Sequence, residues 1–473
     1  MTQNKFFQSR TAIITLIAAC AVVFISLGVR QTFGLFFMDF KKDLGISITN
    51  SGLAVGIQML MWGLTGPIFG AIADRFGGHI AIISAFIFYT FGIYFLYTGP
   101  NTGIFFQIHM GLLIGIGLGG TAISIPMSVV GKHFPLSTRT IAMSIVTAIG
   151  SFGYFLSPIF TTYSLKEYGW NYTLFIFTLF LITGLIAAYF VRSPSESESV
   201  EQISNQSFKE ALTEAFKTKS YILLVSGFFV CGFHITLVGT HVPKYVIDRG
   251  LEDWTAAAIL SLIGLFNIFG SLLSGYLSAK MSKKIILSAI YFLRGVSIIL
   301  FIFTPASNVS AFLFGASFGF LWLSTVPATS GIVAHMFGTK YLGMLYGIVF
   351  LSHQIGAFIG SYGAGIYRDA YGSYSGYWWL AALLGVAGAI LHLFIDEEPY
   401  QNVKDPPRPP ELNTGLLARI WNRRKAVGAV TSTIGVMALL GVWSYLRIDA
   451  NGELAGQQAA VICALHLPFG PLG

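Results

Sequence analysis

The stretch "GAIADRFGG", residues 70–78, carries an acid and a base where the chain turns between two apolar runs. A related stretch, "GYLSAK", occupies residues 275–280, 205 positions further on. A second pair, "RTIAM" at 139–143 and "KYLGM" at 340–344, is offset by 201 positions. Similar offsets for two separate pairs predict a duplicated unit, with two halves that share one orientation.

The composition identifies a membrane protein. Hydrophobic residues make up 54% of the 473 positions and charged residues 10%, whereas a soluble domain carries charge on about a quarter of its positions. Apolar runs of about 20 residues, long enough to cross a bilayer, recur along the chain. With the breakers between them they predict twelve spans, near residues 11–37, 51–73, 79–98, 103–130, 140–164, 171–191, 221–246, 254–278, 285–304, 309–334, 341–366 and 374–395.

Loop charges predict how these spans are oriented. The loops on the side of the N-terminus hold nineteen Lys and Arg residues, and the opposite loops hold six. This asymmetry predicts a cytoplasmic N-terminus. The chain then divides into an N-terminal bundle at 1–192, a cytoplasmic linker at 193–220, a C-terminal bundle at 221–396, a basic amphipathic cytoplasmic segment at 397–425, a possible thirteenth span at 426–446 and a tail at 447–473.

Two arginines, Arg30 and Arg294, fall inside predicted spans, while all 20 acidic residues fall in loops, tails or span ends. A charge in a bilayer is costly unless it is paired, hydrated or faces a cavity. An arginine without an acidic partner suits a carboxylate, because its planar guanidinium donates two parallel hydrogen bonds. Two alternatives stay open: Arg30 could reach toward the membrane surface, and Arg294 could donate to backbone carbonyls or act at a gate.

Polar and aromatic side chains on the same spans extend the predicted site. His234 and His241 lie two turns apart on one helical face, and histidine titrates near physiological pH, so both are candidates for proton coupling, against the alternative of packed, hydrogen-bonded histidines. His234 is also a candidate for substrate binding. The further substrate-binding candidates are Phe33, Tyr154, Asn267, Tyr291, Trp322, His353 and Gln354.

The stretch at 70–78 resembles the signature loop of the major facilitator superfamily, G-x-x-x-D-[RK]-x-G, with Gly70, Asp74, Arg75 and Gly77 at the matching positions. The resemblance implies an all-α membrane fold of two pseudo-symmetric six-helix bundles. It also implies a gating role for these four residues, in which Asp74 faces the positive N-terminal end of span 11.

Other stretches resemble the monocarboxylate transporter-like branch and the bacterial oxalate:formate antiporters. They include "GVRQTFGLFF" at 28–37 and "CGFHITLVGTHVPKYVIDRGL" at 231–251. The acid and arginine of span 8 and the lysine of span 1 in the animal monocarboxylate carriers are absent here. The resemblance implies a multi-pass protein of the bacterial cytoplasmic membrane that works as a monomer.

These observations predict a secondary active transporter of a small organic anion, a monocarboxylate, that works by rocker-switch alternating access with proton symport or anion exchange. Two alternatives stay open. Proton-driven efflux of drugs or amphipaths is suggested by "GSFGYFLSP" at 150–158, although no acid lies inside a span to bind a cation. A nutrient sensor that no longer transports is the more remote alternative.

Other classes of function find no support in the sequence. There is no nucleophile, metal-ligand or cofactor motif, so we expect neither an enzyme nor a resident cofactor or metal. The net charge of +8 comes from scattered loop residues, and we expect no nucleic-acid partner. The expected partners are therefore the lipid bilayer, a small carboxylate, and a proton or counter-anion.

Overall fold

The computed structural model describes residues 10–134, 136–192, 208–338 and 341–398, and these residues form helices and connecting loops without a strand. Eleven segments among them are long and apolar enough to cross a membrane. One of these, in α8 (Leu136–Ala188), reverses at Gly169, whose φ of 78° and ψ of 170° are not helical. The hydroxyls of Ser164 and Thr173 meet across this turn at 2.8 Å, so α8 is a hairpin of two spans and the predicted twelve-span fold is confirmed.

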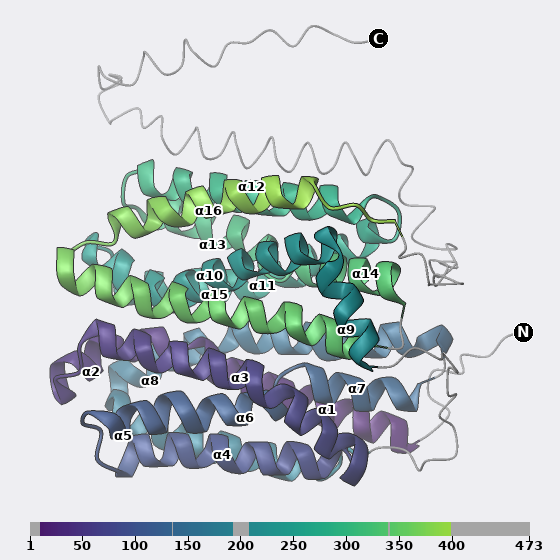
Figure 1. The fold of residues 1–473 in the computed structure, drawn as a ribbon. Coiled ribbons are helices and arrows are strands. Elements are labelled where there is room, and N and C mark those ends of the chain that lie inside the picture. Colours follow the sequence, from purple (N-terminus) through teal and green to yellow (C-terminus); the bar gives the residue numbers. More distant parts are fainter. Residues whose placement is uncertain (1–9, 135, 193–207, 339–340, 399–473) are drawn as a thin grey trace, which may run out of the picture.

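The helices form two layers, one from each half of the chain (Figure 1). With the α8 hairpin, the N-terminal half contains α1 (Arg10–Gln31), α2 (Phe37–Leu44), α3 (Ile48–Phe76), α4 (Gly78–Thr98), α5 (Ile104–Phe106), α6 (Ile114–Thr121) and α7 (Ser124–His133). The C-terminal half contains α10 (Lys219–Asp248), α11 (Asp253–Ser278), α12 (Lys283–Phe303), α13 (Asn308–Phe320), α14 (Thr325–Phe337), α15 (Leu342–Tyr371) and α16 (Ser375–Leu393).

Part of the predicted linker at 193–220 is helical. Residues 208–217 of it form a short amphipathic helix, α9 (Phe208–Lys217), because apolar and charged residues alternate there with helical spacing. The predicted amphipathic segment and thirteenth span after residue 398 lie outside the described residues.

The fourth and tenth spans are each interrupted. Span 4 breaks between α6 and α7, where Ala122 has a ψ of −144°, and span 10 breaks over residues 321–324 between α13 and α14. A proline follows each break, Pro126 in one half and Pro327 in the other, and these two residues are 201 positions apart. The breaks therefore fall at corresponding positions of the repeat.

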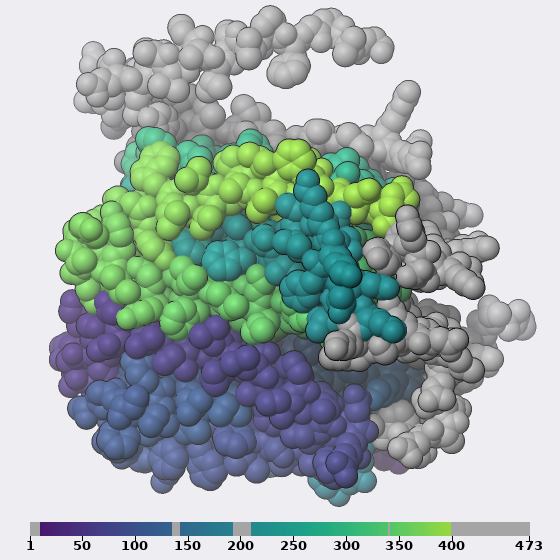
Figure 2. Space-filling model, in the orientation of Figure 1, coloured from purple at the N-terminus to yellow at the C-terminus, as the bar shows by residue number. Residues whose placement is uncertain are grey.

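The halves touch at one end of the bundle, and at the other end glycines of α3 and α15 have free space beside them among the described residues. We call the membrane face where α3 ends and α15 begins the linker side, since α9 lies there, and the opposite face the distal side (Figure 1). On the distal side a Cβ added to Gly52 of α3 would lie 2.7 Å from the carbonyl oxygen of Ser361 on α15. On the linker side a Cβ added to Gly70 of α3 or to Gly343 of α15 would meet nothing within 4 Å. Figure 2 shows α15 lying directly on α3 over much of the visible face.

The close packing of helices at Gly270 of α11 leads to a prediction about the stability of the fold. A Cβ there would lie 1.6 Å from the carbonyl oxygen of Phe320, so Gly270→Ala forces α11 and α13 apart. We expect the free energy of unfolding to fall by about 1–3 kcal/mol, measured by thermal unfolding in detergent. Gly347→Ala, whose Cβ meets nothing within 4 Å, is the matched control and should leave stability unchanged or slightly raised. Equal melting temperatures for the two variants would contradict this packing.

Candidate functional site

Arg30 lies in the last turn of α1 and is 8% exposed. Its Nη2 donates to the thioether Sδ of Met59 at 3.2 Å, and its Cζ lies 5.9 Å from the centre of the Trp62 ring. The Tyr154 phenol also interacts electrostatically with the guanidinium. A thioether is a weak acceptor, and in the part of the chain that the structure describes no carboxylate forms an ion pair with Arg30. This charge is buried without an anion.

The side chains around Arg30 lie at the boundary between the halves. The Trp62 ring contacts the Phe350 ring of α15 edge to face, with centroids 5.8 Å apart. Tyr154 lies against Gly264 of α11, where an added Cβ would be 2.8 Å from the Tyr154 Cβ. Arg30 is thus positioned by helices of its own half that are themselves in contact with the other half.

Several buried polar atoms near this boundary form no hydrogen bond among the described residues. Both side-chain polar atoms of Gln31 are in this state, as are Nε1 of Trp322 and Nε2 of Gln354. Gln31 and the Trp322 ring approach the same point, because a Cβ on Gly239 would lie 4.0 Å from Gln31 Oε1 and 3.4 Å from Trp322 Cη2. Buried polar groups normally have partners, so these atoms are available to a polar ligand.

Arg294 is fully buried but has a different environment. Its Nε and Nη2 donate to the carbonyl of Leu321, at 3.2 and 2.7 Å, and Nη2 also donates to the carbonyl of Trp322. These carbonyls follow the C-terminal end of α13, where a helix concentrates partial negative charge. Arg294 therefore satisfies backbone groups freed by the break in span 10, which is the structural alternative that the sequence left open.

Asn267 completes the same break. Its Oδ1 accepts from the backbone N–H of Leu323 at 2.9 Å, and its Nδ2 donates to the Ser151 hydroxyl of α8 at 2.9 Å. The Ser274 hydroxyl donates to the carbonyl of Ser324. Asn267 thus joins the break in span 10 to the N-terminal half.

Another predicted residue, Tyr291, lies beside Arg294. Its Nη1 donates to Sγ of Cys231 at 3.3 Å, and its Cζ lies 5.5 Å from the ring centre of Tyr291. The ring of His353 stacks on Phe350 with centroids 5.5 Å apart. Cys231 is not among the predicted site residues, because an isolated cysteine in an apolar run gives no sign of its neighbours.

The two histidines differ in their hydrogen bonds. His234 Nε2 donates to the carbonyl of Ala381 at 2.7 Å, and its Nδ1 has no partner among the described residues. His241 Nε2 donates to the carbonyl of Ser361 at 2.8 Å, and its Nδ1 lies 3.0 Å from the Tyr374 hydroxyl. Both rings are fully buried, and of the two only His234 keeps a ring nitrogen without such a partner.

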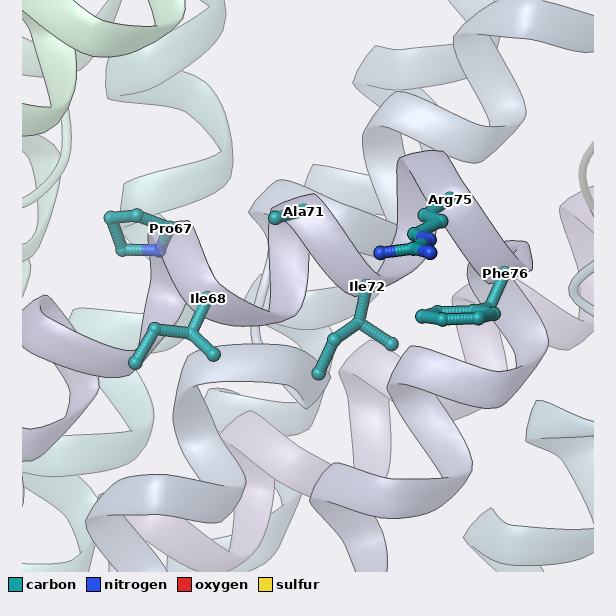
Figure 3. Close-up of a pocket in the computed structure, with 6 residues that line it drawn as sticks. All are labelled: Pro67, Ile68, Ala71, Ile72, Arg75 and Phe76. Carbon is teal, nitrogen blue, oxygen red and sulfur yellow. The ribbon is translucent and has the colours of Figure 1, made fainter.

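The predicted gating motif lies at the linker-side end of α3. Asp74 pairs with Lys132 of α7 at 2.9 Å, and its side chain is 74% exposed. Gly77, with a φ of 94°, makes the turn into α4. A hollow of about 480 Å³ lies along this end of α3 and is lined by Pro67, Ile68, Ala71, Ile72, Arg75 and Phe76 (Figure 3). The gating motif does not contact Arg30 or its neighbours Met59, Trp62 and Tyr154.

Sequence reasoning found Arg30 and Tyr154 but missed most of their neighbours. Met59, Trp62 and Gln31 lie in ordinary apolar runs, and no spacing in the sequence shows which spans pack on span 1. The three-residue separation of Met59 and Trp62 on one helical face is the available signal. Phe33, also predicted, is 2% exposed in the short helix Phe33–Phe36 just after α1.

Residues 19–329 match the family model described as Major Facilitator Superfamily. The chain is similar to an uncharacterized MFS-type transporter, YcxA, of Bacillus subtilis, with 23% identity over 72% of this chain and 84% of that one. It is also similar to monocarboxylate transporter 13 of Rattus norvegicus, with 23% identity over 82% and 85% of the two chains. A hexuronate transporter of Bacillus subtilis shares 22% identity over 74% and 86%.

Solved structures share the fold. A bacterial homolog of the human lysosomal transporter Spinster, in an inward-facing and unoccupied conformation, superposes with a TM-score of 0.62 at 15% identity and covers 81% of this chain and 95% of its own. The POT family transporter PepTSo gives a TM-score of 0.61 at 13% identity and covers 81% and 97%.

The contrast between the arginines predicts different stability effects. Arg294→Lys loses the planar set of donors to two carbonyls, and we expect the free energy of unfolding to fall by about 2–3 kcal/mol. Arg30→Lys should cost less than about 1 kcal/mol, because Arg30 donates to a thioether, which is a weak acceptor. Thermal unfolding of both variants in detergent without substrate compares them. A larger loss for Arg30→Lys would contradict these environments.

Proposed function

The chain belongs to the major facilitator superfamily, and from that premise we propose that it is a secondary active transporter of a small organic anion, a monocarboxylate. The observation that carries the proposal is the buried guanidinium of Arg30, which has no carboxylate partner among the described residues. A substrate carboxylate would supply the missing negative charge and could accept two parallel hydrogen bonds.

The surroundings of Arg30 suit such a substrate. Trp62 and Met59 offer apolar surface for the organic part, and the Tyr154 phenol is a further polar group beside the charge. The free polar atoms of Gln31, Trp322 and Gln354 would orient polar groups of the substrate from both halves. In transporters of repeated architecture, substrate sites commonly lie where the repeats meet.

Among the predicted substrate contacts, we propose Arg30, Tyr154, Trp322 and Gln354 as the direct ones. Arg294 and Asn267 are engaged with the break in span 10, so we propose that they support the site by holding that break. The other candidates have two roles in this proposal. His234 is the coupling group, and the outer wall is formed by Phe33, Tyr291 and His353.

Energetics limits how an anion can be moved. With the cell interior negative, entry of one negative charge alone works against about 2.3 kcal/mol per 100 mV. Accumulation therefore needs an accompanying cation or exchange for another anion. We propose proton symport through His234 or anion exchange, by alternating access of the two halves, in a single chain of the bacterial cytoplasmic membrane with a cytoplasmic N-terminus.

Uptake measurements on Arg30 test the substrate class. In proteoliposomes with a panel of radiolabelled mono- and dicarboxylates, Arg30→Gln should reduce carboxylate uptake and counterflow at least tenfold, because loss of one partner of a buried charge pair costs about 2 kcal/mol or more. Arg30→Lys keeps the charge and should retain part of the activity. Normal uptake by a folded Arg30→Gln protein would refute the anion site, and transport of amphipathic cations alone would favour efflux.

A pH-jump assay tests proton coupling. Because His234 Nδ1 is free to accept a proton, His234→Gln should remove the stimulation of uptake by an inward proton gradient while substrate counterflow persists. His241→Gln is the matched control, since both nitrogens of that ring already have partners, and it should keep the stimulation. Unchanged coupling in the His234 variant would leave anion exchange as the mechanism.

A further inference from the structure

We propose that Asp369 is a second gating acid, which holds the distal entrance closed by capping the start of α3 from the opposite half of the protein. The backbone N–H of Thr49, in the first turn of α3, donates to Asp369 Oδ2 at 2.8 Å. The first N–H groups of a helix have no intrahelical acceptor and carry partial positive charge. A carboxylate is therefore a fitting partner, and this bond crosses between the halves.

The neighbouring charges leave Asp369 available for this contact. Arg368, the adjacent residue, donates from Nε to Asp248 Oδ2 at 2.7 Å, and Lys244 pairs with the same carboxylate. Asp369 itself forms no ion pair among the described residues. A second bond between the halves, from the Ser361 hydroxyl to the carbonyl of Gly52 at 2.9 Å, lies on the same contact.

The linker side carries a matching acid that is not engaged with the other half. Asp74 lies near the end of α3, as Asp369 lies near the end of α15, and the two helices run antiparallel. Asp74 pairs with Lys132 of its own half. The family resemblance implies that this acid faces the N-terminal end of α15 when the linker side closes.

Glycines along α3 and α15 support this reciprocal arrangement. The distal contact places Gly52 against Ser361, and Gly365 against Ile48 and Thr49. The same antiparallel register, continued toward the linker side, places Gly66 opposite Gly347 and Gly70 opposite Gly343. An added Cβ meets no described atom within 4 Å at Gly70, Gly343 or Gly347. At Gly66 it meets only the carbonyl oxygen of Gly119, 3.9 Å away. The two helices therefore carry a second contact surface of small residues that is unused in this conformation.

It follows that each end of the α3–α15 pair has its own acid and its own small-residue contact, and that one end is closed at a time. Opening the distal side breaks the bond from Thr49 to Asp369, and closing the linker side brings Asp74 to α15. This inference concerns the gate and holds whether or not the substrate is an anion.

Hydrogen–deuterium exchange of the full-length protein, in lipid nanodiscs without substrate, tests the role of Asp369. Asp369→Asn weakens the cap, and we expect amides at the start of α3 to exchange about two- to fivefold faster. Amides of α3 and α15 on the linker side should exchange more slowly, as the population shifts toward the opposite conformation. Glu167→Gln, which removes an exposed acid from the turn of α8 on the same membrane face, is the matched control and should change neither region.

A size series at Gly343 provides the reciprocal measurement. A Cβ on residue 343 meets no described atom within 4 Å in the present conformation. Gly343→Leu adds bulk on the side where Gly70 would approach, so distal amides of α3 should exchange more slowly than in the parent. Gly343→Ala should have a smaller effect in the same direction. Two results for Asp369→Asn would overturn the proposal. Faster exchange on both sides would mean general destabilisation. Unchanged exchange would mean that the bond is a surface contact without a gating role. Because the readout needs no substrate, it is independent of the Arg30 uptake test.

Discussion

The hydrocarbon interior of a bilayer supplies no hydrogen bonds, and this constraint governs the rest of the structure. Every backbone N–H and C=O within it must find a partner in the protein, so the described chain is built of helices. Where span 10 is interrupted, Arg294, Asn267 and Ser274 take the place of the missing helical bonds. A break in a membrane helix is tolerated because side chains from neighbouring helices satisfy it, and those side chains are then committed to the fold.

The same constraint separates two arginines that look alike in the sequence. Arg294 is surrounded by carbonyl oxygens at the end of α13, which spread and stabilise its charge without an acid. Arg30 has a thioether, an indole face and a phenol beside it, and no carboxylate pairs with it among the described residues. Burial alone does not make a binding site. The difference is whether the protein itself completes the electrostatics of the group or leaves this to a ligand.

The position of Arg30 connects chemistry to movement. Its neighbours Trp62 and Tyr154 touch α15 and α11 of the other half, so any change in the angle between the halves alters the surroundings of the charge. The α3–α15 pair that forms one of these contacts also carries the distal cap and the separated linker-side glycines. One pair of helices thus connects the proposed ligand site at Arg30 with both ends of the protein.

The sequence by itself determined the fold class, the twelve spans and the two-fold repeat, because hydropathy over about 20 residues and recurring loop signatures depend on local composition. It also identified both arginines as charges without a nearby acid. It did not predict α9 within the linker, or the contacts of Met59, Trp62 and Asp369. These depend on which helices pack together and in what register, which no periodicity within one span encodes. Tertiary structure alone decided that Arg294 completes a helix break while Arg30 has no acidic partner in the described part of the chain, because such partners come from distant segments of the sequence.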